Sequence, residues 1–318
     1  RCGTTLRERH YGRDMNFADP VERLLFLQQL PLLRGLASHR VALLAEAAEE
    51  CILQEGDSLI AEGDPRDSFF AAARGRYRLL FEGRPVWDAE APVLLGLFEA
   101  LADDRRTRII ALEPGLALRI PRAALRDLVE DAFDVVEHLL REAGEMLALQ
   151  DWLEVSRLLA TRPSVHRELP GGKNWNSFVA RLSALRAAPV LRSFDFDSLG
   201  HLARRGVVAQ LSPQTVWQSG DLGSHFYVVL EGRPPTGGIL VGFLEALAEA
   251  PRFHDFVVED GMTVMRFDRD MLFDVLEDHP TSAFALLSTF ATLVIELFVA
   301  RDHLRLHAAE ELRDPGDR

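Results

Sequence analysis

The sequence predicts an α+β protein in which one unit of strands and helices occurs twice. Three observations predict this class. Short β-like runs follow one another between Gly-Asp turns, long stretches with apolar residues three and four apart come after them, and both patterns recur in the second half of the 318-residue chain. We expect the copies at 21–162 and 177–318, joined by a Pro/Gly-containing linker at 163–176 and preceded by a tail at 1–20.

Composition and charge narrow the classes of protein and partner. Hydrophobic residues make up 47% and charged residues 27%, which is typical of a soluble globular protein. A formal charge of -13 repels phosphate backbones, so we expect no nucleic-acid partner. The two cysteines, Cys2 and Cys51, form no disulfide framework, which favours the cytoplasm. The apolar run Thr281–Ile295 is shorter than the about 20 residues that span a bilayer, so we expect no membrane span.

Each copy is expected to begin with helices. The sequence PLLR at 31–34 is echoed by PVLR at 189–192. Amphipathic helical stretches follow both motifs, at Val41–Ala48 in the first copy and at Leu199–Ala203 in the second.

Glycines align the β-like part of the copies. The interval is 157 residues between Gly63 and Gly220 but 146 residues between Gly96 and Gly242, so the second copy is eleven residues shorter in between. The first copy has a strand, a Gly-containing turn and a second strand at 76–95. Either this hairpin is shorter in the second copy, or a loop is missing there.

Each copy then continues with strands and ends with helices. The stretches Ile109–Ile120 and Phe256–Phe267 predict paired strands joined at Glu-Pro-Gly and Glu-Asp-Gly turns. Apolar residues at helical spacing predict long helices at Arg122–Leu149 and Arg269–Leu306.

This order of elements resembles the cyclic-nucleotide-binding domain family, which includes the sensor module of catabolite-activator-type regulators and the regulatory subunit of cyclic-AMP-dependent kinase. The resemblance rests on the Gly-Asp turns, the glycine-led short helix and the arginine after it, and covers roughly Leu24–Leu149 and Phe178–Leu306. It implies two antiparallel β-rolls (jelly-rolls), each flanked by helices, with a phosphate-binding cassette between two strands.

The resemblance also implies candidate ligand-binding residues in each cassette. A glycine that opens a short helix lets backbone N–H groups reach an anion, and an arginine adds charge-assisted hydrogen bonds. The candidates are Gly96, Leu97, Arg105 and Arg106 in the first copy and Gly242, Phe243 and Arg252 in the second.

Both cassettes depart from the family at one position. The family has a glutamate directly after the glycine, which accepts a hydrogen bond from the ribose 2′-hydroxyl. Leu97 and Phe243 stand there, each nine positions before Arg106 and Arg252. Loss of a charge-assisted acceptor costs about 1.5–3 kcal/mol in binding. We therefore expect degenerate cassettes with no bound cofactor, in which the arginines pair with acidic neighbours. An altered small-anion ligand and ordinary cyclic-nucleotide binding remain the alternatives.

The functional prediction is a non-enzymatic regulatory or adaptor protein that acts through protein–protein contacts. No nucleophile, zinc or P-loop motif occurs, and we expect no metal site, with His303 and His307 incidental. The apolar helix 283–300 is the candidate surface for a protein partner or a homodimer, with burial inside the protein as the alternative. A second functional hypothesis is a genuine sensor whose ligand repositions the flanking helices. In that case Trp152 is a candidate lid over the base.

Overall fold

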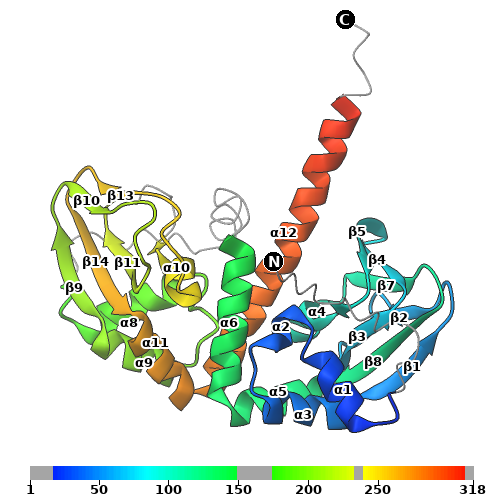
Figure 1. Ribbon diagram of the computed structural model, residues 1–318. Coiled ribbons are helices and arrows are strands. Elements are labelled where there is room, and N and C mark those ends of the chain that lie inside the picture. The colour runs from blue at the N-terminus through cyan, green and yellow to red at the C-terminus, as the bar shows by residue number, and fades with distance from the viewer. Residues whose placement is uncertain (1–16, 149–173, 233–238, 312–318) are drawn as a thin grey trace, which may run out of the picture. The chain divides into compact units, whose positions relative to one another are not determined.

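The computed structural model describes residues 17–148, 174–232 and 239–311, with side chains described as far as residue 300 (Figure 1). Trp152, and most of the predicted tail and linker, lie outside these ranges. Antiparallel sheets with flanking helices confirm the predicted α+β class. By its internal contacts the chain divides into two units, Arg1–Ala100 with Arg105–Leu125, and Leu101–Asp104 with Arg126–Arg318. Residues 126–148, which the sequence prediction assigns to the first copy, group with the second unit.

From residue 17 onward, where its description begins, unit 1 contains three helices followed by two four-stranded antiparallel sheets, ordered β1-β8-β3-β6 and β2-β7-β4-β5. Two further helices cross the division between the units. The elements are α1 (Pro20–Leu27), α2 (Pro31–Arg34), α3 (Ser38–Ala47), β1 (Glu49–Leu53), β2 (Ser58–Ile60), β3 (Ser68–Arg74), β4 (Arg76–Phe81), β5 (Arg84–Glu90), β6 (Val93–Leu95), β7 (Thr107–Ala111) and β8 (Gly115–Pro121), with α4 (Leu97–Ala102) and α5 (Arg122–Asp131) crossing the division.

Unit 2 repeats this order in a reduced form, with sheets β12-β11-β14-β9 and β10-β13 in the described residues. Its elements are α6 (Phe133–Ala148), α8 (Phe178–Ala187), α9 (Phe196–Arg205), β9 (Val207–Leu211), β10 (Gln214–Trp217), β11 (His225–Glu231), β12 (Leu240–Val241), α10 (Phe243–Ala248), β13 (Phe256–Val258), β14 (Met262–Asp268), α11 (Arg269–Asp278) and α12 (Pro280–Glu311).

The strand registers reproduce the intervals seen in the sequence. Phe70 of β3 pairs with Leu95 of β6, and Tyr227 of β11 pairs with Val241 of β12. Phe70 and Tyr227 are 157 positions apart, whereas Leu95 and Val241 are 146 apart. Both intervals therefore join residues at the same place in the two rolls.

Two arginines perform the same structural task in the two units. Arg23 of α1 donates to the carbonyl of Ala48 at 2.6 Å, just beyond the end of α3. Arg181 of α8 donates to the carbonyl of Gly206 at 3.1 Å, just beyond the end of α9. A guanidinium at this place satisfies carbonyls that the helix leaves unpaired and opposes its negative end.

The predicted pairing within 109–120 and within 256–267 is wrong. β7 pairs with β2 and β4, whereas β8 pairs with β1 and β3. Likewise, β13 pairs with β10, and β14 with β11 and β9. After β7 the Leu112 N–H donates to the carbonyl of Arg76 at 2.8 Å, and Pro114 has no N–H to donate. The chain consequently passes from one sheet to the other here instead of folding back as a hairpin.

The hairpin predicted in the first copy is confirmed. β4 and β5 pair through a turn at Glu82 and Gly83, whose φ angles are 50° and 75°. In the described part of unit 2, the strand that matches β7 has only β10 beside it. The sheet corresponding to β2-β7-β4-β5 is therefore limited there to β10 and β13.

Helix α12 is long enough to span a membrane, contrary to the expectation from the sequence. Its segment Pro280–Ala300 is long and apolar enough to cross a membrane by length and composition, because the helix continues through Glu296. About half of the tested window, 56%, is buried inside the protein. Length and composition here do not distinguish a core helix from a membrane span.

Candidate functional site

Both cassettes begin with a glycine in the left-handed region. Gly96 has a φ of 77° and Gly242 a φ of 74°, which only glycine adopts readily. Each glycine carbonyl accepts from the N–H four residues later, at 2.9 Å from Ala100 and at 3.2 Å from Ala246. The predicted glycine-led short helices are confirmed as α4 and α10.

The arginine of the second cassette is buried and fully engaged. Arg252 is 2% exposed, and its guanidinium donates to the carbonyl of Gly242 at 3.0 Å and to that of His225 at 2.6 Å. Its Cζ also lies 4.0 Å from the ring centroid of Trp217. The hydrogen-bond and ring partners of this guanidinium are therefore backbone carbonyls and an aromatic face, while the acidic neighbours Glu245 and Asp221 act on it through their charge.

Phe243 occupies the position of the family's glutamate but lies in the core. Its ring makes an edge contact with Phe226 of β11 at 4.8 Å and lies 6.3 Å from Phe290 of α12. All six residues of α10 are buried. On the α6 side the packing is close, because a Cβ at Gly144 would lie 3.0 Å from the Cβ of Ala248. This helix is thus enclosed by protein.

An aromatic cluster fills the inside of the second roll. Trp217 stacks on Tyr227 with centroids 5.6 Å apart and an interplanar angle of 4°, and Phe256 lies 4.7 Å from Trp217. Sequence reasoning missed Trp217. A position-by-position comparison of the two copies reveals it, because the matching residue of unit 1 is Ile60.

Other interior positions of unit 2 are also larger than their counterparts. The counterparts of Ala72, Ala111, Gly115 and Ala117 are Val229, Val258, Met262 and Val264. In unit 1 the same core includes Tyr77 and Ala89 from the hairpin. The larger side chains of unit 2 form a closed core without these hairpin residues.

Burial shifts the pKa values of two groups around Arg252. Burial and the charge of Arg252 lower the pKa of His225 to about 4. Glu245 of α10 is 0% exposed. Burial raises the pKa of Glu245, and nearby peptide N–H groups and the charge of Arg252 offset this only in part. Burial in the second cassette therefore favours the neutral forms of His225 and Glu245.

The first cassette is arranged differently. Leu97 is buried, and a Cβ at Gly96 would collide with the Cδ1 of Ile60. Arg105 and Arg106 are exposed, and the guanidinium of Arg106 lies 4.6 Å from the ring centroid of Phe81. Ile60 therefore fills the space above the cassette glycine.

The structural counterpart of Arg252 is Arg105. The N–H of Gly63 donates to the Arg105 carbonyl at 2.8 Å, and the N–H of Gly220 donates to the Arg252 carbonyl at 2.9 Å. Sequence spacing singled out Arg106, because the second copy has one additional residue between its cassette helix and its arginine.

Helix α12 is mainly an internal element. Of the predicted contact surface at 283–300, most apolar side chains are buried, and the helix packs against α6 and α11 (Figure 1). Burial inside the protein, the stated alternative, therefore accounts for most of this surface. Phe298 is a large apolar side chain of this surface that remains exposed, at 39%.

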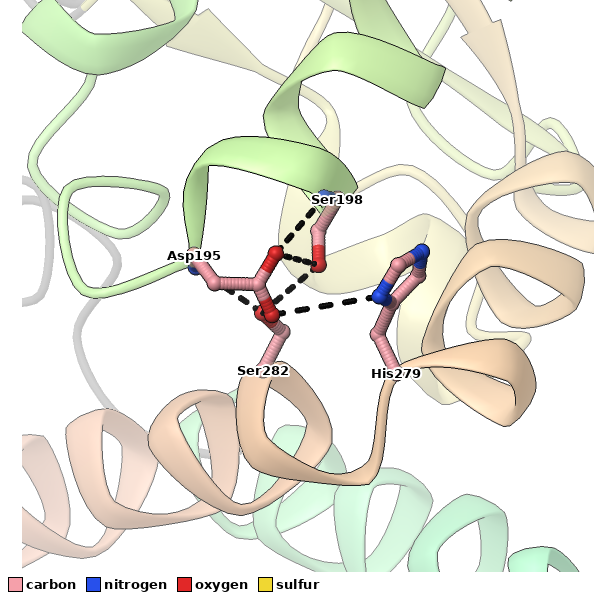
Figure 2. A network of polar contacts seen from close by, with 4 residues as sticks. All are labelled: Asp195, Ser198, His279 and Ser282. Carbon is pink, nitrogen blue, oxygen red and sulfur yellow. Dashed lines mark hydrogen bonds and ion pairs between the residues drawn. The ribbon is translucent and has the colours of Figure 1, made fainter.

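A separate polar cluster joins α9 to the start of α12 (Figure 2). The Asp195 carboxylate accepts from the hydroxyls of Ser198 and Ser282, and lies 3.9 Å from Nδ1 of His279. Neither hydroxyl is hydrogen-bonded to the imidazole, so the cluster lacks the nucleophile–base contact of a catalytic triad. Within the described residues, no group of three His, Cys, Asp or Glu side chains is placed to hold a metal ion.

Comparison with known proteins identifies one curated relative and several solved structures. No family model matches the chain. A cGMP-dependent protein kinase of Drosophila melanogaster, isozyme 1, is 28% identical over 141 residues, which cover 42% of this chain and 18% of the kinase. The chain therefore spans less than a fifth of the curated relative that it matches.

Two solved structures illustrate the structural likeness. A cAMP-bound mutant of the regulatory subunit of a cAMP-independent protein kinase A from Trypanosoma brucei is 17% identical, with a TM-score of 0.34, over 84% of this chain and 91% of that chain. A mutant of a cAMP-binding acyltransferase from Mycobacterium smegmatis is 25% identical, with a TM-score of 0.32, over 41% of each chain.

In both units antiparallel strands lead through a left-handed glycine into a short helix and on to further strands and helices. The chain is thus similar to this kinase over part of its sequence, and its antiparallel sheets with flanking helices are of the α+β class, consistent with the fold of the cyclic-nucleotide-binding domain proteins that it resembles.

Proposed function

We propose that this chain is a non-enzymatic regulatory or adaptor protein of the cytoplasm, in which two degenerate cyclic-nucleotide-binding-like units act through protein–protein contacts. The observation that carries the proposal is the engagement of Arg252 by the carbonyls of Gly242 and His225 and by the ring of Trp217. A phosphate would have to displace all three interactions and enter beside the buried carboxyl of Glu245.

The remaining parts of both cassettes support the same proposal. Phe243 and Leu97 are buried apolar residues where the family has its ribose-binding glutamate. Ile60 lies over Gly96 in unit 1, and the aromatic cluster around Trp217 fills the roll of unit 2. Neither cassette offers a ribose acceptor, and both have their own side chains where the ligand would lie.

The protein contact is proposed to use the exposed part of α12 that includes Phe298. Exposed aromatic side chains contribute strongly to interfaces when a partner buries them. A homodimer and a different protein partner both satisfy this proposal, and sedimentation velocity of the purified chain separates them.

Titration and co-isolation together test the proposed function. Calorimetry with cyclic AMP, cyclic GMP and cyclic dinucleotides is expected to give no binding heat. Partner proteins co-isolated from cells, or self-association of the purified chain, are expected to be lost in Phe298→Asp and kept in Leu222→Asp, a control that alters another exposed apolar residue of unit 2. Nucleotide binding, or contacts unaffected by Phe298→Asp, contradicts the proposal.

A further inference from the structure

The polar cluster in unit 2 is a hydrogen-bond network in which two buried serines bond a partly exposed carboxylate. The Oδ1 atom of Asp195 accepts from the N–H of Ser198 at 2.7 Å and from its hydroxyl at 2.8 Å. The Oδ2 atom accepts from the Ser282 hydroxyl at 2.9 Å, and the Asp195 N–H donates back to Ser282 Oγ at 3.1 Å. Both serines are 0% exposed, and their hydroxyl oxygens lie 2.8 Å apart.

This network connects two helices that are far apart in the sequence. Asp195 is the N-cap of α9, and Ser282 lies in the first turn of α12, immediately after the bend at His279 that ends α11 (Figure 2). One carboxylate therefore caps α9 and holds the beginning of α12. Hydrogen bonds to a charged group are roughly twice as strong as those between neutral groups.

The first copy lacks every member of this network. The registers of β1 with β8 and of β9 with β14 place Ala37 and Arg40 at the positions of Asp195 and Ser198. The positions of His279 and Ser282 correspond to Ala132 and Val135. Ala37 is also an N-cap, of α3, but has no side-chain hydrogen bond to offer. The fold therefore forms without the network, and the second copy has it in addition.

The carboxylate remains charged in this position. Burial acts to raise the pKa of Asp195, but the N–H and hydroxyl of Ser198 and the hydroxyl of Ser282 outweigh it and hold the pKa below its usual value. The imidazole of His279 also touches the ring of His201, at a centroid distance of 5.2 Å. Asp195 and His201 are the titratable groups in contact with His279 within the described residues.

We propose that Asp195, Ser198 and Ser282 form a latch that fixes the beginning of α12 to α9 and so holds the helices of unit 2 in one arrangement. The latch acts without a ligand, because its bonds all lie within the protein. The latch restrains the helices of unit 2, in addition to the contacts that hold the cassette. It does not depend on the partner proposed for α12.

Hydrogen exchange of the peptides that cover residues 280–290 tests the latch. In Ser282→Ala the two hydrogen bonds to Asp195 are lost, and we expect exchange of this segment to be about tenfold faster or more. Thr289→Val is the matched control, because the Thr289 hydroxyl lies on the same helix but donates to Ala285 of its own backbone. Exchange in this control is expected to stay within about twofold of the unchanged protein.

Asp195→Asn provides a second, milder change, because the amide keeps one oxygen for the N–H of Ser198. We expect faster exchange of 280–290 in this variant too, with residues 133–140 of α6 as the internal reference. Exchange of 280–290 that is unchanged in both Ser282→Ala and Asp195→Asn overturns the latch. The exchange experiment tests only the latch, whereas nucleotide titration tests the proposed function. The failure of one proposal can therefore be distinguished from the failure of the other.

Discussion

The guanidinium of Arg252 lies 4.0 Å from the centroid of the Trp217 ring, and both side chains are buried in the second roll. Trp217 in turn stacks on Tyr227, so the arginine covers one end of an aromatic cluster. The same guanidinium bonds the carbonyl of Gly242 at the start of α10. An arginine in the position of a ligand-binding group thus stabilises the cassette itself.

Replacement of Arg252 is expected to destabilise unit 2. In Arg252→Met the carbonyls of Gly242 and His225 lose their donors while the volume is roughly kept. Leaving buried carbonyls unpaired costs about 1–3 kcal/mol each, so we expect a loss of about 3 kcal/mol in the free energy of unfolding. Urea denaturation measures it. Arg105→Met, at the exposed counterpart, is expected to cost less than half as much, and equal losses would contradict the structural role of Arg252.

Alanine substitutions at two glycines distinguish the cost of backbone strain from the cost of a steric collision at the second cassette. Gly242 and Gly220 both have positive φ angles, 74° and 94°. A Cβ at position 242 would collide with Nη1 of Arg252, whereas at position 220 it would meet nothing within 4 Å. Gly220→Ala should cost about 1–2 kcal/mol through strain alone. We expect Gly242→Ala to cost clearly more in the same denaturation experiment, and equal costs would place Arg252 elsewhere.

Acidification is expected to destabilise the protein through His225. Its pKa in the folded state is about 4, below the value of about 6.5 for an unfolded chain. As the pH falls from about 6.5 towards 4, the unfolded state therefore takes up a proton that the folded state does not, and stability decreases. Melting temperatures at pH 7 and pH 5 measure the loss. His225→Gln should reduce this loss, and an equal loss in the variant would contradict the role of His225.

Close packing of α6 on α10 predicts a strong effect at Gly144. A Cβ at Gly144 would lie 3.0 Å from the Cβ of Ala248, so Gly144→Leu must push the two helices apart. We expect a loss of about 2 kcal/mol, in the range found for overpacked cores. At Gly200 a Cβ would meet Phe178 at 3.7 Å, an ordinary contact. Gly200→Ala should therefore keep or increase thermal stability, and a tolerated Gly144→Leu would contradict this helix packing.

Much of the fold is predictable because some residues have few conformational choices. Gly96 and Gly242 have positive φ angles, and their spacing in the sequence locates both short helices correctly. The register pairs Phe70 with Leu95 and Tyr227 with Val241 follow the same intervals. The positive φ angles depend on local backbone geometry, and the register intervals follow from the internal repeat, so a single sequence records both.

Other features depend on contacts between residues distant in the sequence and cannot be predicted from local sequence patterns. Two strands around a Glu-Pro-Gly turn have the same pattern whether they pair or enter different sheets, so the partners of β7 and β8 were predicted wrongly. One additional residue in the second copy hides the match between Arg105 and Arg252. The aromatic cluster around Trp217 arises from residues on three separate strands, β10, β11 and β13.

Calorimetric titration of the purified protein with cyclic AMP and cyclic GMP tests the central claim most directly, which is the proposal that Arg252, Trp217 and Phe243 close the second cassette to a nucleotide. We expect no binding heat with either nucleotide, both for the unchanged protein and for Arg105→Met. Micromolar binding to the unchanged protein that is abolished in a folded Arg252→Lys variant would contradict the account, because it would show that Arg252 serves a ligand.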